Sequence, residues 1–214
     1  MGGKVKAQDW PNLNRYKNEN TALKPAESGQ KRIVFMGDSI TEFWSTVDSE
    51  YFSGKPYVNR GISGQTTPQM LLRFRADVIA LNPAAVVILA GINDIAGNTG
   101  PMTIEMIRDN IFSMIELAKA NHITVILCSV LPAYDFPWKP NKEPIAKIKA
   151  LNEILRNYAL ANEIVYLDYY SAMVDERKGL KADYSNDGVH PNKTGYHVMA
   201  PLADKAIALA LKVK

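Results

Sequence analysis

Apolar residues follow two alternating patterns in this 214-residue chain. Short, continuous apolar runs rich in β-forming residues indicate strands at 31–36, 57–58, 84–90, 123–130 and 164–167. Apolar residues at helical spacing indicate amphipathic helices at 40–52, 67–80, 103–120, 143–162 and 193–212. Strands that alternate with helices in this way predict a parallel sheet with helices on both faces, because a helical crossover joins successive parallel strands.

The beginning of the chain does not share this alternation. Residues 8–30 are polar and contain Pro11 and Pro25 as helix breakers, so we expect an arm over 1–30 with one short helix at most. Beyond this arm, neither a repeat nor a linker interrupts the pattern. The remaining residues, 31–214, are therefore expected to form one domain.

Four short segments of small and polar residues lie where predicted strands end or where the last helix begins. They read Gly37-Asp38-Ser39, Gly61-Ile62-Ser63-Gly64, Gly91-Ile92-Asn93-Asp94 and Asp187-Gly188-Val189-His190. In an open α/β sheet, ligands bind beyond the carboxyl ends of the strands. We therefore expect a site at this edge of the sheet, to which all four segments contribute.

Ser39 is the candidate nucleophile, since it stands where a strand turns into a helix and a helix start favours negative charge. Asp187, three residues ahead of His190, can reach the imidazole Nδ1, which leaves Nε2 free to face a hydroxyl. Each residue also has a plainer interpretation. Ser39 suits a helix N-cap, Asp187 a turn ahead of glycine, and His190 an ordinary surface position.

Acyl transfer also needs hydrogen-bond donors for the negative charge that develops on the substrate oxygen. Gly64 offers a backbone N–H and Asn93 a side-chain amide, although both residue types are also common in turns and at strand ends. A metal site of Asp187, His190 and His197 is the competing interpretation. It is disfavoured because His197 falls inside a predicted helix, so we expect neither a metal nor a cofactor.

Composition narrows the class of protein. With 47% apolar and 22% charged residues, the chain can bury a full core, which excludes a disordered protein. The net charge of +3 is too small to favour a nucleic-acid partner. The single cysteine, Cys128, excludes an intrachain disulfide and a cysteine metal cluster. No membrane span is expected, because no apolar stretch approaches the ~20 residues that a membrane helix needs.

The cellular location and the oligomeric state stay open at this point. Residues 1–10 lack the apolar segment of a signal peptide. Val5-Lys6-Ala7 ahead of Gln8 nevertheless resembles the end of such a peptide. The protein is therefore expected to be either exported, to the periplasm or beyond, or cytoplasmic.

The four segments, in this order and at these separations, resemble the sequence blocks of the SGNH (GDSL-type) hydrolases, a family named for its Ser, Gly, Asn and His. The resemblance covers roughly residues 31–210. It implies a flavodoxin-like three-layer α/β/α sandwich with a mainly parallel sheet of about five strands. It also implies an ester hydrolase in which Ser39 is the nucleophile, His190 the base and Asp187 its partner. The implied oxyanion hole consists of the Ser39 N–H, the Gly64 N–H and the Asn93 amide.

The expected reaction is hydrolysis through a covalent acyl-Ser39, on short-acyl esters such as O-acetylated carbohydrates. The loop 131–141 favours this substrate class, because prolines stiffen it and its aromatic residues suit stacking against sugar rings; they are Tyr134, Phe136 and Trp138. Asp38 and Trp44 are further candidate substrate-lining residues. For all of these residues the alternative is a structural role, in packing for the aromatic residues and in bracing a turn for Asp38.

Two rival functions keep the same fold. One is a lysophospholipase or thioesterase of the same family, which would act on a longer or different acyl group. The other is a catalytically silent carbohydrate-binding protein. The presence of Ser39, Asp187 and His190 together argues against the silent protein, which has no physical need for all three.

Overall fold

The computed structural model describes residues 8–24 and 29–212. The segment Val5 to Ala7, which resembles the end of a signal peptide, lies outside these described residues. Five parallel strands form one sheet in the order β2-β1-β3-β4-β5, with bounds β1 (Ile33–Gly37), β2 (Tyr57–Gly61), β3 (Ala85–Leu89), β4 (Thr124–Cys128) and β5 (Val165–Leu167). This strand order is that of the flavodoxin-like folds.

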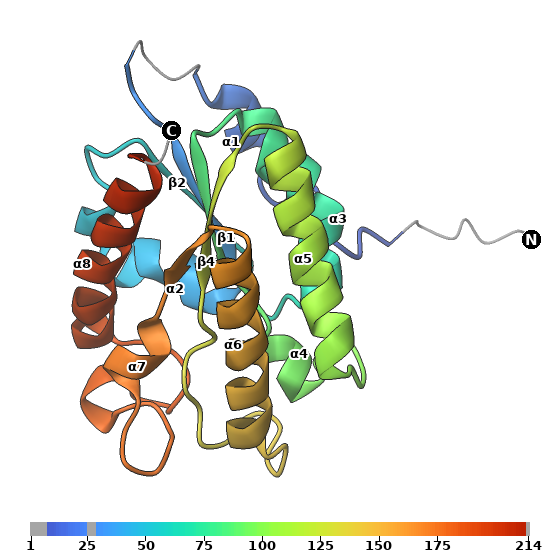
Figure 1. Ribbon diagram of the computed structural model, residues 1–214, viewed down its shortest axis with the longest axis vertical. Helices are drawn as coiled ribbons and strands as arrows, with labels where there is room; N and C mark the ends of the chain where they lie inside the picture. Colours follow the sequence, from blue (N-terminus) through green and yellow to red (C-terminus); the bar gives the residue numbers. More distant parts are fainter. Residues whose placement is uncertain (1–7, 25–28, 213–214) are drawn as a thin grey trace, which may run out of the picture.

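Helices cover both faces of the sheet, which confirms the predicted three-layer α/β/α sandwich (Figure 1). One face carries three helices that contact one another in chain order, α3 (Thr67–Asp77), α5 (Ile104–Ala120) and α6 (Pro144–Ala161). The other face carries two helices in mutual contact, α2 (Ser39–Val47) and α8 (Lys193–Ala210). The described residues also form three short α-helices, α1 (Lys17–Ala22), α4 (Ile92–Ala96) and α7 (Tyr169–Met173), and three 3-10 turns at Ser49–Tyr51, Ile79–Leu81 and Ala182–Tyr184.

Local sequence determines where several of these elements begin and how deeply they are buried. β1 and β3 are buried over their full length, as central parallel strands covered on both faces should be. Thr66 and Gln69 form a capping box at the start of α3. At the start of α8, the side chain of Asn192 accepts the N–H of Gly195 at 3.0 Å.

Two glycines let α2 lie directly against the ends of β1 and β2. A Cβ atom on Gly61 would collide with the backbone of α2 and lie 2.7 Å from the carbonyl oxygen of Asp38. A Cβ atom on Gly37 would lie 2.8 Å from the carbonyl oxygen of Leu89. Because Gly37 pairs in register with Gly61 on one side and Leu89 on the other, the segments that follow β1, β2 and β3 leave the sheet together.

The elements differ from the predicted ones in several places, three of them near the candidate site residues. β2 continues to Gly61 instead of ending at Val58, because the polar residues Asn59 and Arg60 still pair with β1. The helix predicted over 40–52 ends at Val47. The five-residue helix α4 was not predicted, since so short a helix shows no apolar periodicity.

Candidate active site

Ser39 is the first residue of α2, directly after the turn that ends β1. The carboxyl group of Asp38 caps this helix, with its Oδ1 accepting the N–H of Ile40 at 2.9 Å. The N-cap role considered for Ser39 therefore falls to Asp38. Because the first N–H groups of a helix have no acceptor within it, Ser39 presents its hydroxyl and its N–H at the positive end of the helix dipole.

A row of hydrogen bonds joins Ser39 to the segment ahead of α8. The Oγ atom of Ser39 lies 2.9 Å from Nε2 of His190. On the other side of the ring, Nδ1 of His190 lies 2.6 Å from Oδ2 of Asp187. The fold thus brings together the three residues that the sequence suggested as nucleophile, base and carboxylate. The arrangement permits proton transfer from the hydroxyl to the imidazole.

The carboxylate of Asp187 is held by its own turn. Its Oδ1 accepts the backbone N–H groups of Val189 at 2.9 Å and His190 at 2.8 Å. Burial alone would raise the pKa of Asp187, but hydrogen bonds from His190 and Val189 outweigh it and hold the pKa at about 2. Asp187 is therefore a carboxylate at neutral pH, and it keeps the Nδ1 proton of His190 in place.

Ser185 organises the same turn and was not among the predicted site residues. Its Oγ accepts the N–H of Gly188 at 3.0 Å and lies 2.7 Å from the carbonyl oxygen of His190. Oγ also lies 3.1 Å from Oδ1 of Asp187. The signal in the sequence was a serine two residues ahead of an aspartate and a glycine, a pattern typical of side-chain-stabilised turns.

The two further oxyanion candidates lie beyond the neighbouring strands. Gly64 follows β2 and has φ +75°, a left-handed conformation that favours glycine. Asn93 is buried in α4, and its Nδ2 donates to the carbonyl oxygen of Gln65 at 3.0 Å, which leaves a second N–H on the same nitrogen. Asn98 joins the two, since its Nδ2 donates to Oδ1 of Asn93 at 2.9 Å and to the carbonyl oxygen of Gly64 at 3.3 Å.

Two aromatic side chains flank the imidazole of His190. The ring of Phe43 lies 5.3 Å from it and that of Trp138 lies 5.8 Å from it, centroid to centroid. Both are partly open to solvent, at 37% and 40% exposure. Trp138 is fixed by a hydrogen bond of 3.1 Å from its Nε1 to Oδ1 of Asn98. Phe43 was not predicted, although its position one helical turn after Ser39 on α2 was a usable signal.

Three of the other candidate lining residues lie elsewhere. Trp44 is only 2% exposed and stacks on Tyr51 and Tyr196, so it packs the core behind α2. Phe136 is fully buried and belongs to the core as well. Tyr134 is exposed, but its ring lies under the guanidinium of Arg177 at 4.2 Å. Of the aromatic residues proposed from the loop 131–141, only Trp138 neighbours His190 within the described part of the chain.

Asp38 is likewise buried and does not line an open surface, which corrects its place among the lining candidates. Burial raises the pKa of Asp38 to about 7, against the lowering effect of the Ile40 N–H. Asp94, next to Asn93, is also buried, and this raises its pKa to about 6 although Thr67 donates to it. The Asp94 carboxylate accepts the N–H and hydroxyl of Thr67 at 2.9 and 2.6 Å, so it braces the start of α3.

The competing metal interpretation finds no geometric support. His197 lies against Asp48, with 3.7 Å between Nε2 and Oδ1, on a partly exposed stretch of α8. Among residues 8–24 and 29–212, no three His, Cys, Asp or Glu side chains gather in a way that could hold a metal ion. In the same residues, no helix is both long and apolar enough to cross a membrane.

Comparison with known proteins places this chain in a family. The family model for GDSL-like lipases and acylhydrolases matches residues 35–198. A candidate acylhydrolase from Bacteroides fragilis shares 49% identity and a TM-score of 0.94, over 96% of this chain and 100% of that one. A GDSL-like lipase from Bacteroides thetaiotaomicron shares 49% identity and a TM-score of 0.90, over 94% of this chain and 99% of that one.

More distant structures share the fold. The acetylxylan esterase Axe2 from Geobacillus stearothermophilus is 22% identical with a TM-score of 0.66, over 86% of this chain and 96% of that one. No curated protein matches the chain. The match over 35–198 and the two relatives at 49% identity show that this chain belongs to the GDSL-like lipase/acylhydrolase family of ester hydrolases.

Proposed function

We propose that this ester hydrolase works through a covalent acyl-Ser39 intermediate and that its substrates are short-acyl esters, such as O-acetylated carbohydrates. The observation that carries the nucleophile assignment is the unbroken row of hydrogen bonds Ser39–His190–Asp187, with links of 2.9 and 2.6 Å. A hydroxyl is a weak nucleophile, and it becomes effective when a positioned base takes its proton. His190 is within reach for that transfer.

The proposed reaction proceeds in two halves. Nε2 of His190 takes the Ser39 proton while Oγ attacks the ester carbonyl, and the tetrahedral intermediate collapses when His190 returns that proton to the leaving alcohol. A water molecule then gives a proton to His190 and attacks the acyl-Ser39, and collapse releases the carboxylic acid and restores the hydroxyl. The N–H groups of Ser39 and Gly64 and the second N–H of Asn93 Nδ2 stabilise the oxyanion in both halves.

Labelling with a serine-directed fluorophosphonate, followed by peptide mass mapping, tests the nucleophile. The expected result is one adduct, on the peptide that contains Ser39, and complete loss of ester hydrolysis in Ser39→Ala with an unchanged melting temperature. Ser63→Ala is a suitable control, because it removes a nearby hydroxyl that faces Glu42. Wild-type turnover in a folded Ser39→Ala protein would overturn the assignment.

The aromatic residues beside His190 support the proposed substrate class. Phe43 and Trp138 offer two ring faces at the site, and Asn98 holds Trp138 in position. Flat aromatic faces suit sugar rings. Distant structures with the same fold include acetylxylan esterases, whose names give an acetylated sugar polymer as the substrate of those proteins.

A chain-length series distinguishes this substrate class from lipid-directed members of the family. We expect kcat/KM on p-nitrophenyl esters to be highest for the acetyl ester and to fall toward the dodecanoyl ester. On an acetylated saccharide, Trp138→Ala should raise KM, whereas Tyr134→Ala, an exposed aromatic residue of the same loop that lies under Arg177, should not. A rate that climbs with chain length would instead favour the lysophospholipase or thioesterase alternative.

A further inference from the structure

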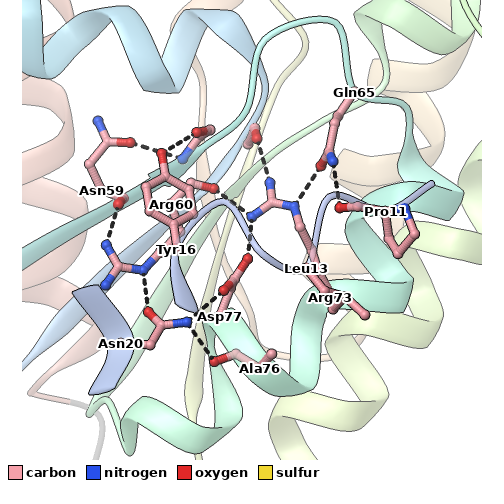
Figure 2. A network of polar contacts seen from close by, with 12 residues as sticks. Pro11, Leu13, Tyr16, Asn20, Asn59, Arg60, Gln65, Arg73, Ala76 and Asp77 are labelled. Carbon is pink, nitrogen blue, oxygen red and sulfur yellow. Dashed lines mark hydrogen bonds and ion pairs between the residues drawn. The ribbon is translucent and has the colours of Figure 1, made fainter. Parts of the chain in front are cut away.

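Residues 9–22, the part of the arm that contacts the domain, lie on the loop 61–66 that carries Gly64 (Figure 2). This part of the chain precedes the family match over residues 35–198. Tyr16 of this arm is 7% exposed, and its hydroxyl donates to the carbonyl oxygen of Gly61. The side-chain Nε2 of Gln65 donates to the carbonyl oxygen of Pro11 at 2.8 Å. The arm therefore contacts both ends of the loop on which an oxyanion donor is placed.

Arg73 of α3 connects this loop to the end of β1 from below (Figure 2). It is fully buried, with Nε donating to Oε1 of Gln65 at 2.5 Å. Its Nη1 donates to the carbonyl oxygen of Arg60 at 2.9 Å, and its Nη2 to that of Gly37 at 2.9 Å. One guanidinium thus ties the end of β2 and Gln65 to the residue that precedes the Asp38–Ser39 turn.

The arm also secures Arg73 itself. Asp77 lies 3.0 Å from Nη1 of Arg73 and neutralises its buried charge. Asn20 of α1 donates to the same carboxylate at 2.7 Å, and its Oδ1 accepts Nε of Arg60 at 2.8 Å (Figure 2). Buried polar groups that are all partnered in this way specify one arrangement of the chain.

The network leads from the arm to both oxyanion donors outside α2. Gln65 directly follows Gly64, and its carbonyl oxygen accepts Nδ2 of Asn93 at 3.0 Å. Between Gly61 and Gln65, the N–H of Ser63 donates at 2.8 Å to Glu42. The same carboxylate accepts Nη2 of Arg15 from the arm at 3.1 Å. Gly61 and Gln65 are therefore held by direct hydrogen bonds with the arm, and Ser63 by a hydrogen bond to Glu42, which the arm contacts.

We propose that Tyr16 and Gln65 are positioning residues for ester hydrolysis, through which the arm aims the Gly64 N–H and the Asn93 amide at the substrate oxyanion. This proposal rests on the proposed catalytic function of Ser39, His190 and Asn93. Donors stabilise an oxyanion only when they are fixed at about 2.7–3.1 Å from it, and small misplacements are costly. Two other hydrogen bonds restrain the loop beside Gly64, from the N–H of Gln65 to the carbonyl oxygen of Ile62 and from Nδ2 of Asn98 to that of Gly64, and both are long at 3.3 Å.

The test uses Tyr16→Phe, which removes one hydroxyl, and Gln65→Met, which keeps the length of the side chain and removes its hydrogen bonds. We expect kcat on p-nitrophenyl acetate to fall about tenfold in the first and more in the second, with KM within about twofold, as for changes in a supporting shell. An alkylboronic acid, whose adduct with the Ser39 hydroxyl carries a tetrahedral anion, should bind more weakly by the same factor as kcat/KM falls.

Tyr51→Phe is the matched control. Tyr51 is buried to the same degree as Tyr16 and its hydroxyl donates to Asp204 at 3.0 Å, near the start of β2 instead of its end. We expect Tyr16→Phe and Tyr51→Phe to lower the melting temperature similarly, and only Tyr16→Phe to lower kcat. Full kcat in both Tyr16→Phe and Gln65→Met would overturn the positioning role, as would an equal loss in Tyr51→Phe. Wild-type activity in a folded Ser39→Ala protein would instead overturn the proposed function, on which this proposal rests.

Discussion

The side-chain amide of Asn93 is held from two sides, by the carbonyl oxygen of Gln65 and by the amide of Asn98. These two hydrogen bonds fix the orientation of the amide before any substrate binds. Because the amide is planar, they also fix the direction of the second N–H of Nδ2. Preorganisation of this kind is what makes a hydrogen-bond donor effective toward charge that develops in a transition state. A surface asparagine that rotated freely could donate the same hydrogen bond but would stabilise the transition state far less.

Asn93→Ala tests this role. We expect kcat to fall by about 10²–10³, the usual cost of one oxyanion donor, with KM little changed, because the donor acts mainly on transition-state charge. Steady-state kinetics on p-nitrophenyl acetate gives both constants, and a melting curve controls for folding. Asn110→Ala is a matched control, since its amide donates at 3.1 Å to the hydroxyl of Thr67, which in turn donates to Asp94 and not to Asn93. A lowered melting temperature with normal kcat would make Asn93 purely structural.

The pH dependence of activity separates His190 from Asp187. Hydrogen bonds hold the pKa of Asp187 at about 2, against the effect of burial, so its carboxylate is ionised throughout the neutral range. His190 must be neutral to accept the Ser39 proton, so protonation of this base stops catalysis while Asp187 is still ionised. We expect kcat/KM to rise through one ionisation as the pH is raised from acid toward alkaline values. A profile that is flat from pH 5 to 9 would contradict a histidine base.

In the loop between β2 and α3, two positions require glycine for different physical reasons. Gly61 has no room for a side chain, since a Cβ atom would meet the backbone of α2. Gly64 has open space around the position of a Cβ, but its φ of +75° disfavours any other residue. One position is therefore constrained by packing and the other by backbone conformation.

Alanine at each glycine should separate these constraints. Gly61→Ala is expected to lower the free energy of unfolding by up to about 3 kcal/mol through overpacking, and to reduce activity by displacing α2 with Ser39. Gly64→Ala should lower the free energy of unfolding by only about 1–2 kcal/mol, the cost of a left-handed residue, yet reduce kcat as its N–H shifts. Chemical denaturation and ester hydrolysis measure the two effects. A Gly64→Ala protein with normal kcat would remove Gly64 from the oxyanion hole.

Prediction from the sequence succeeded where a local signal existed. Apolar runs rich in β-forming residues predicted the five strands, and the polar segments at strand ends and ahead of the last helix contain Ser39 and His190, whose side chains lie 2.9 Å apart. Residues such as Arg73 and Tyr16 were missed, because a buried arginine and an arm tyrosine acquire meaning only from partners that are distant in sequence. Trp44 shows the converse, since a tryptophan near a nucleophile block looks the same in sequence whether it faces the site or the core.

The proposed catalytic row Ser39–His190–Asp187 is assembled from segments that are far apart in the sequence. Ser39 follows the first strand, whereas Asp187 and His190 precede the last helix. The hydroxyl of Tyr196 on α8 donates to the carbonyl oxygen of Ile40 on α2 at 2.8 Å, which fastens the two helices beside the site. The row of hydrogen bonds therefore depends on the packing of α2 against α8, two helices that are far apart in the chain.

Global stability should in turn depend on the pH because of Asp38, buried beneath this junction. Its pKa is raised by burial to about 7, so folding favours the neutral acid. The stability that this provides is fully present below the unfolded-state pKa of about 3.9 and is lost as the pH rises through about 7. Oδ2 of Asp38 has no hydrogen-bond partner among the described residues, which leaves the ionised form uncompensated. Asp94, with a pKa raised to about 6, adds to the same trend.

Asp38→Asn removes the ionisation and keeps the helix cap, because the asparagine carbonyl can accept the Ile40 N–H as Asp38 does now. Relative to wild type, this variant should gain about 3 kcal/mol of stability as the pH rises from 5 to 8, since the folded-state pKa lies about two units above pH 5 and one pKa unit corresponds to about 1.4 kcal/mol. Urea denaturation at several pH values measures the difference. The exposed Asp109→Asn serves as the control and should follow the wild-type curve. An Asp38→Asn curve that runs parallel to wild type would show that Asp38 is already ionised in the folded protein at pH 5.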